Sequence, residues 1–217
     1  MRLNPWPWIG FLVLAILPAS GCTRIPLCLG HERFIIPREI EQIHRLRSYI
    51  ASDSFSPDSL RTSQRARIDS IFFTALRISE GSTLAALRIA AFATIPYYTF
   101  PAIIPLVRWV IWIPVTTESR EEFEKRFRNL PTDFLSDSSP GNDRDKLPHF
   151  FGSAFITCST RDPVYAEMAG RIIEWLELAF KLEGSMDPRD IEVNAMGAEF
   201  GMALMQGRKM SPSCFLQ

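Results

Sequence analysis

The sequence lacks the excess of basic residues that nucleic-acid-binding proteins carry. Lysine plus arginine and aspartate plus glutamate both number 24 in 217 residues, so the formal net charge is zero at neutral pH. This balance excludes a strongly basic nucleic-acid binder. Because 47% of the residues are hydrophobic, the composition also excludes intrinsic disorder. The length suffices for one ordinary domain with a hydrophobic core.

The sequence also lacks the short motifs of well-defined sites. It contains no Cys-x-x-Cys pair, so neither a zinc knuckle nor a thioredoxin-like redox site is indicated. The Gly-x-Ser-x-Gly elbow, the His-Glu-x-x-His motif and the P-loop are absent too. We therefore expect no metal and no cofactor. No stretch alternates apolar and polar residues over enough positions to predict a sheet, so we predict a mainly α protein.

Residues 1–21 have the features of a cleaved signal peptide. Arg2 precedes an apolar run, Ile9–Leu17, which is shorter than the roughly 20 residues of a membrane-spanning helix. The residues Ala19-Ser20-Gly21-Cys22 resemble the lipobox of bacterial lipoproteins. This resemblance implies that Cys22 is lipidated, with palmitate among its acyl chains, and becomes the mature N-terminus. The alternative is an ordinary small-x-small cleavage site that Cys22 merely follows.

The export signal predicts that the protein lies in the bacterial cell envelope and contacts the membrane through lipidated Cys22. Thr23, in place of Asp, favours the outer membrane, facing the periplasm. Disulfides are permitted in that oxidising compartment. Cys28, Cys158 and Cys214 remain beside Cys22, so one pair can form, and Cys158–Cys214 and Cys28–Cys214 are equally open.

Residues 22–128 are expected to form a helical N-terminal part. Apolar residues spaced at helical intervals predict an amphipathic helix over 37–51. A second helix is predicted to begin at Ser56-Pro57 and to end at Gly81. A capping box of Ser119 and Glu122 predicts a charged helix that runs to about residue 128.

Within this part, residues 84–115 form an apolar segment that prolines interrupt. The prolines are Pro96, Pro101, Pro105 and Pro114. They make a regular membrane-spanning helix a poor interpretation, so we expect a helix to about Thr94. The broken segment that follows is expected either to lie on the core or to dip into lipid headgroups. Trp109 and Trp112 suit an interfacial belt and an aromatic core equally well.

Residues 129–144 are rich in Pro, Asp, Ser and Gly and are predicted to form a loop. The C-terminal part, 145–207, is predicted to hold three helices. Asp145 is expected to cap the first, and Asp187 with Pro188 to open the third. The second is expected to run from Val164 to Leu182. Its predicted buried residues are Val164, Met168, Ile172, Leu176, Ala179 and Phe180.

The third helix carries one stripe of residues with little bulk. The stripe consists of Asp190, Asn194, Gly197 and Gly201, at steps of four, three and four. Another helix can therefore approach its backbone closely. If that partner is the first helix, whose His149 and Ser153 form a small polar face, the imidazole is expected to meet Asp190 and Asn194 in a semi-buried pocket.

These residues resemble a known signature. The pattern Asp145-Lys146-x-x-His149-Phe150, then Glu174, then Asp190-x-x-x-Asn194-x-x-Gly197-x-x-x-Gly201 is similar to one shared by VanZ-like membrane proteins and small bacterial envelope lipoproteins of unknown function. The resemblance covers residues 145–201. It implies an envelope location and a polar site of His149, Asp145, Asp190 and Glu174, with Asn194, Gly197 and Gly201 as binding positions. It implies no settled reaction.

Three functions follow from these patterns. The first is a lipid-anchored envelope protein with a binding or maintenance role at its C-terminal polar site. The second is a hydrolase or transferase that acts on an envelope lipid or a peptidoglycan precursor, with His149 as general acid or base. The third is a non-catalytic module that docks on the membrane surface. A purely structural interpretation stands beside them, because Asp190 lies in a first helical turn, where negative charge is favoured by roughly 0.3–1 kcal/mol.

Overall fold

The fold is known from a computed structural model. It describes residues 22–24, 35–56, 63–104, 109–135, 143–180 and 187–216. The side chains of residues 22–24, 35–37, 100, 102–104 and 172–180 lie outside this description. The chain divides into two compact units, residues 1–41 and 42–217.

The first unit contains a short antiparallel pair of strands. Strand β1 (Cys22–Arg24) pairs with β2 (Ile35–Pro37), and Cys22 lies opposite Pro37. Helix α2 (Arg38–Ala51) begins directly after β2, which agrees with the helix predicted over 37–51. The signal peptide (residues 1–21), the side chain of Cys22 and Cys28 lie outside the described part of the chain.

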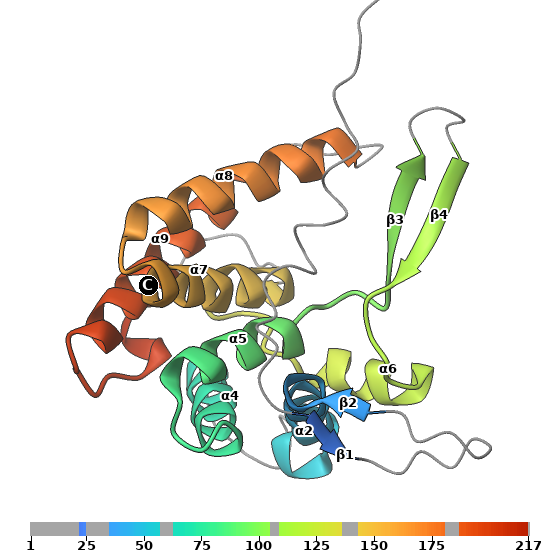
Figure 1. The fold of residues 1–217 in the computed structure, drawn as a ribbon, viewed down its shortest axis with the longest axis horizontal. Coiled ribbons are helices and arrows are strands. Elements are labelled where there is room, and N and C mark those ends of the chain that lie inside the picture. Colours follow the sequence, from blue (N-terminus) through green and yellow to red (C-terminus); the bar gives the residue numbers. More distant parts are fainter. Residues whose placement is uncertain are drawn as a thin grey trace, which may run out of the picture. The chain divides into compact units, whose positions relative to one another are not determined.

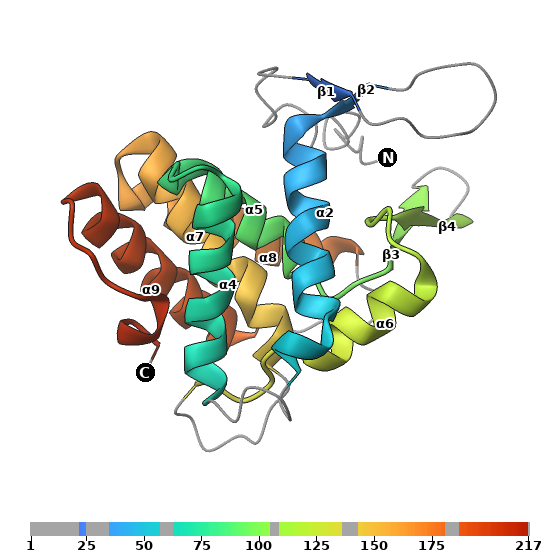
Figure 2. The ribbon, with the colours of Figure 1, turned by 90° about the horizontal axis from the view of Figure 1, so that it is seen from below.

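The second unit is a bundle of helices, so the predicted mainly α fold is confirmed (Figure 1). Its helices are α4 (Gln64–Ile78), α5 (Thr83–Ala93), α6 (Arg120–Asn129), α7 (Lys146–Thr160), α8 (Pro163–Phe180) and α9 (Pro188–Met205). Helix α7 lies at the centre and contacts α5 on one side and α8 and α9 on the other, while α4 packs on α5 (Figure 2). No helix among the described residues is both long enough and apolar enough to cross a membrane.

Side-chain caps fix where several of these helices begin. The Ser63 hydroxyl accepts a hydrogen bond from the N–H of Ala66 at the start of α4, which is later than the start predicted at Ser56. The capping box of Ser119 and Glu122 is present at α6, as predicted. The Asp187 carboxylate accepts from the N–H of Arg189 and caps α9, as predicted. Each cap satisfies a backbone donor that the first helical turn leaves free.

Aromatic rings form the centre of the core. Phe200 of α9 packs between Phe72 of α4 and Phe150 of α7, with ring centroids 5.2 and 5.5 Å away, and Phe151 lies 5.3 Å from Phe150. All four side chains are buried. Helices that are distant in sequence are thus joined by one apolar cluster, which positions α7 against α9.

The proline-broken segment contains a sheet that the sequence did not predict. Residues Thr99–Ile104 form strand β3 and Trp109–Pro114 form β4, an antiparallel hairpin in which Pro101 lies opposite Trp112. Helix α5 ends at Ala93, as predicted, but every residue of β4 is exposed. The expectation that this part lies on the core is therefore wrong for β4.

Two further expectations are corrected by the structure. In α8, Val164 and Met168 were predicted to be buried but are exposed, whereas Ala166 is fully buried. The first two turns of α8 therefore bury a different face from the one predicted. The predicted buried residues from Ile172 onward lie outside the described side chains. Cys158 and Cys214 are both free, so neither disulfide that the sequence left open for Cys214 is formed.

Candidate functional site

The two glycines of α9 let that helix touch the backbone of α7. Gly197 lies against the carbonyl oxygen of Phe150, and a Cβ added at Gly201 would lie 2.7 Å from the carbonyl oxygen of Ala154. A side chain at either position would displace the α7 backbone. The predicted close approach of another helix to this stripe is confirmed, and both glycines are buried in the helix pair.

A buried lysine lies where the N-termini of α7 and α9 meet. The Lys146 Nζ is 2.7 Å from Asp190 Oδ1, 2.6 Å from Asp187 Oδ2 and 3.0 Å from Asp145 Oδ2. Only 2% of the Lys146 side chain is exposed. We call these four residues the lysine cluster. Asp145 binds the lysine and makes no capping hydrogen bond to the backbone, so its predicted role as a side-chain cap is wrong.

Lys146 and Asp187 keep their charges at neutral pH. Burial by itself lowers the pKa of the Lys146 ammonium, but the carboxylates of Asp187, Asp190 and Asp145 raise that pKa above its ordinary value. The pKa of Asp187 is lowered in turn: burial opposes the shift, but the hydrogen bonds from Lys146 and the Arg189 N–H and the positive charges of both side chains together outweigh it. A buried cation among acidic partners is a strong constraint, because removal of the lysine would leave the buried Asp190 carboxylate without compensation.

His149 lies beside the cluster, one turn along α7. Its Nε2 atom is 3.8 Å from Asp190 Oδ1, and its side chain is largely buried. The two groups are thus close, as predicted, but farther apart than a hydrogen bond. The imidazole does not meet Asn194, because the Asn194 amide oxygen accepts a hydrogen bond from the Ser153 hydroxyl at 2.8 Å. The side chain of Glu174 lies outside the described residues.

A second ion pair extends the polar region toward the preceding loop. Asp143 is buried, and its Oδ2 accepts hydrogen bonds from the N–H groups of Phe134 and Leu135 at 2.9 and 3.2 Å. Its Oδ1 accepts a hydrogen bond from the guanidinium of Arg189 in α9. The loop that precedes α7 is therefore held to the same helix N-terminus as the lysine cluster.

A groove of about 620 Å³ lies between α8, α9 and the C-terminal residues. Its wall is mostly apolar, with Val164 from α8 and Ile191 and Met202 from α9. Asn194, which faces α7 through its amide oxygen, also lines this groove. Of the residues predicted for the site, Asn194 therefore borders an open space, whereas His149 is not among the groove-lining residues.

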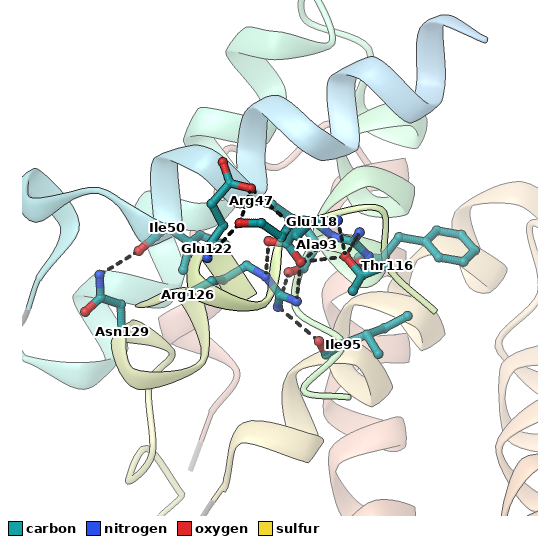
Figure 3. Close-up of polar contacts among 11 residues, drawn as sticks. Arg47, Ile50, Ala93, Ile95, Thr116, Glu118, Glu122, Arg126 and Asn129 are labelled. Carbon is teal, nitrogen blue, oxygen red and sulfur yellow. Dashed lines mark hydrogen bonds and ion pairs between the residues drawn. The ribbon is translucent and has the colours of Figure 1, made fainter. Parts of the chain in front are cut away.

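A second buried cluster joins α2, α6 and the residues that follow β4 (Figure 3). Arg126 of α6 is fully buried and makes two hydrogen bonds to the carboxylate of Glu118, at 2.8 and 2.9 Å. Arg47 of α2 donates to the Thr116 hydroxyl at 2.7 Å, and that hydroxyl donates to Glu118 at 2.6 Å. We call these four residues the arginine cluster.

The arginine cluster joins the segments on both sides of the hairpin. Arg126 Nη1 donates to the carbonyl oxygens of Ala93 and Ile95, each at 3.0 Å, before β3. Thr116 and Glu118 follow β4. Burial alone would raise the pKa of Glu118, but the hydrogen bonds from Arg126 and Thr116 and the charges of Arg126 and Arg47 hold it below its ordinary value. The carboxylate is therefore ionised at neutral pH.

The sequence analysis did not predict that Lys146 and Arg126 are buried cations at the middle of polar clusters, although the sequence contains an indication for each. Lys146 lies on the same helical face as the buried residues Phe150 and Ser153, and Arg126 lies between Phe123 and Leu130 on the buried face of α6. A cation on an apolar stripe is an unfavourable placement unless a partner meets it. The partner could not be named, because it comes from another segment.

Within the part of the chain that the structure describes, no three His, Cys, Asp or Glu side chains are grouped so that they could hold a metal ion. No protein-family model matches the chain, and neither characterised proteins nor solved structures gave a match. The geometry of the two clusters, the groove and the hairpin therefore carries the functional argument.

Proposed function

We propose that the protein is a lipid-anchored protein of the bacterial cell envelope that binds an envelope lipid in the groove between α8 and α9. The lipobox-like residues that end at Cys22 support the anchor. The groove carries the binding role: its wall is mostly apolar, and Asn194, whose amide oxygen accepts a hydrogen bond from Ser153 of α7, places a polar group in it. Pockets with apolar walls and few polar groups are typical of ligand sites.

The lysine cluster supports this function structurally. Its ion pairs hold the N-terminus of α9 against that of α7, and α9 forms one wall of the groove. Four charged residues border the groove: Arg171, Arg208, Glu167 and Glu199. Arg171 is paired with Glu167, whereas Arg208 makes no ion pair with a described residue. A guanidinium binds phosphate well, so the ligand chemistry that fits is an apolar chain with a phosphate head. A phospholipid and a lipid-linked peptidoglycan precursor share that chemistry.

A groove-filling substitution tests the binding role. Ala195 lines the groove and is exposed, whereas Glu192 on the same helix is exposed outside it. We expect Ala195→Trp to weaken the binding of a fluorescent short-chain phosphatidylglycerol by about tenfold or more. A tenfold weaker affinity corresponds to a loss of about 1.4 kcal/mol of binding free energy. The matched Glu192→Trp variant should change affinity less than about twofold. Equal affinities in the two variants would contradict binding in the groove.

Two further measurements complete the test. Competition by a polyprenyl phosphate distinguishes a lipid-linked precursor from a phospholipid as the preferred ligand. Metabolic palmitate labelling should be lost in Cys22→Ser if the anchor is correct, and labelling that persists would remove the lipoprotein part of the proposal.

A hydrolase or transferase is the second candidate, and the proximity of His149 to Asp190 favours it. The geometry supports catalysis less well than binding. Asp190 Oδ1 is 2.7 Å from the Lys146 ammonium but 3.8 Å from the imidazole, and a general base works within about 2.6–3.2 Å of its partner. Complementation of a deletion strain with His149→Ala separates the two. If His149 is catalytic, the variant should fail to restore wild-type behaviour. If the protein only binds a ligand in the groove, the variant should restore it.

A further inference from the structure

The β3–β4 hairpin exposes apolar side chains on both of its faces. In β4, Trp109 is 69% and Trp112 65% exposed, and the residues between and beside them are exposed as well. Successive residues of a strand point to opposite faces. One face therefore presents Trp109, Ile111 and Ile113, and the other presents Val110 and Trp112. In Figure 1 the paired strands extend beyond the helices of their unit, with β3 in contact with α8.

A folded protein partner is a poor match for this surface. A partner that packs on a sheet covers one face, and one that adds a strand pairs with one edge, so the second apolar face would stay in water. A lipid phase contacts both faces at once. The sixteen residues 99–114 contain a single charged residue, Arg108, which makes the hairpin compatible with such a phase.

The hairpin suits shallow insertion and not a crossing. Six residues of strand reach about 20 Å, whereas the hydrocarbon core is about 30 Å thick. A two-stranded hairpin also keeps free backbone groups along its two edges, and these are costly in hydrocarbon. Pro101 and Pro114 carry no N–H, so they reduce the number of free donors. Tryptophan rings are most stable at the headgroup level.

The base of the hairpin is built to hold it in place. The arginine cluster binds the chain at Ile95 before β3 and at Glu118 after β4. The N–H of Val115 also donates to the carbonyl oxygen of Tyr98 at 3.1 Å, directly below the paired strands. An element that is ordered before it binds loses less conformational entropy on binding. Exposed apolar surface on a fixed support is typical of an interaction site.

We propose that the β3–β4 hairpin inserts into the interfacial region of a lipid bilayer, with Trp109 and Trp112 at the headgroup level. The hairpin thereby gives the protein a membrane contact that is separate from the lipid at Cys22. This inference rests on the proposed function only in that the proposed anchor supplies the membrane; the apolar faces of the hairpin are independent of the groove.

Fluorescence quenching by brominated lipids tests the insertion. The full chain is reconstituted into vesicles of phosphatidylethanolamine and phosphatidylglycerol, with or without bromine on the acyl chains. We expect bromine to quench the wild-type tryptophan emission. In the double variant Trp109→Phe and Trp112→Phe, we expect at least about half of the quenched emission to be lost, because interfacial tryptophans lie within reach of the acyl chains. Equal quenching in the two proteins would overturn the proposal.

A matched pair of charge variants supplies the control. Ile111→Glu with Ile113→Glu places two carboxylates on the hairpin, and Tyr165→Glu with Met168→Glu places two at exposed apolar sites of α8 that do not line the groove. Circular dichroism should show that both variants are folded. Only the hairpin variant should lose bromine quenching, and equal loss in both would contradict the inference.

Other occupants give different results. If a second copy of the chain covers the hairpin, the mass in solution doubles and the tryptophan emission shifts to the blue without vesicles, which overturns the proposal. Palmitate labelling and groove binding report on the proposed function separately. Quenching that persists in a chain without palmitate would support the hairpin and reject the anchor, and palmitate without quenching would do the reverse.

Discussion

Replacement of Lys146 by methionine should strongly destabilise the protein. Methionine keeps much of the side-chain volume but removes the ammonium that Asp145, Asp187 and Asp190 share. Asp145 and Asp187 are 38% and 39% exposed, so water can solvate them after the change, whereas Asp190 is only 7% exposed. The variant therefore leaves one buried carboxylate without a cation.

An uncompensated buried charge costs about 3–5 kcal/mol. We expect this loss in the free energy of unfolding of Lys146→Met, measured by urea denaturation. It corresponds to a fall in the melting temperature of about 6–20 °C for a chain of this size. The double variant Lys146→Met with Asp190→Asn removes the stranded charge and should recover part of the loss. A cost below about 1 kcal/mol for the single variant, or additive effects of the two changes, would refute the reasoning.

The pH dependence gives a further check on the same cluster. The pKa of Lys146 is raised, so its contribution to stability is complete below its ordinary value of 10.5 and is lost only above it. The pKa of Asp187 is lowered, so its contribution is present above its ordinary value of 3.8 and is lost as the pH falls below it. The stability difference between wild type and Lys146→Met should stay constant near neutrality and shrink below about pH 4.

Three further changes test the packing, the second cluster and the cysteines. Gly197→Ala should destabilise the protein by about 1–3 kcal/mol because its methyl group would displace the α7 backbone. The matched Gly152→Ala, which meets open space, should stabilise it by up to about 1 kcal/mol in the same urea assay. Arg126→Met should cost about 3–5 kcal/mol because its buried carboxylate partner remains. Iodoacetamide at about pH 8 should modify exposed Cys214 well before Cys158, since burial raises the pKa of the Cys158 thiol to about 11 and leaves about one thousandth of it as thiolate; similar rates would contradict this.

The C-terminal helix pair was predictable because its determinants are periodic in one segment. Asp190, Asn194, Gly197 and Gly201 repeat at helical steps, and absence of bulk is itself the packing signal. The proximity of His149 to Asp190 followed from the same stripe. The central role of Lys146 did not follow, because a lysine next to an aspartate also fits an exposed helix start, and its deciding partners come from α9.

The hairpin was not predictable from alternation for a physical reason. Period-2 patterning arises when one face of a strand is buried and the other meets water. Strand β4 is exposed on both faces and apolar on both, so its sequence reads as an unbroken apolar run. The prolines were correctly taken to interrupt a helix, but Pro101 and Pro114 also fit strands whose outer edges lack partners.

The two clusters use the same device to join segments that hydrophobic packing alone would leave free to slide. An apolar helix face tolerates several registers, because methyl groups and rings repack with small losses. A cation on that face, such as Lys146 on α7 or Arg126 on α6, is stable only where carboxylates or carbonyl oxygens meet it. Each cation therefore selects one register. Lys146 fixes the helix that forms a wall of the groove, and Arg126 fixes the base of the hairpin. Conservative changes at these two residues should consequently disturb positions of whole elements, whereas changes to the exposed ion pair of Lys125 with Glu121 on α6 should leave both surfaces unaltered.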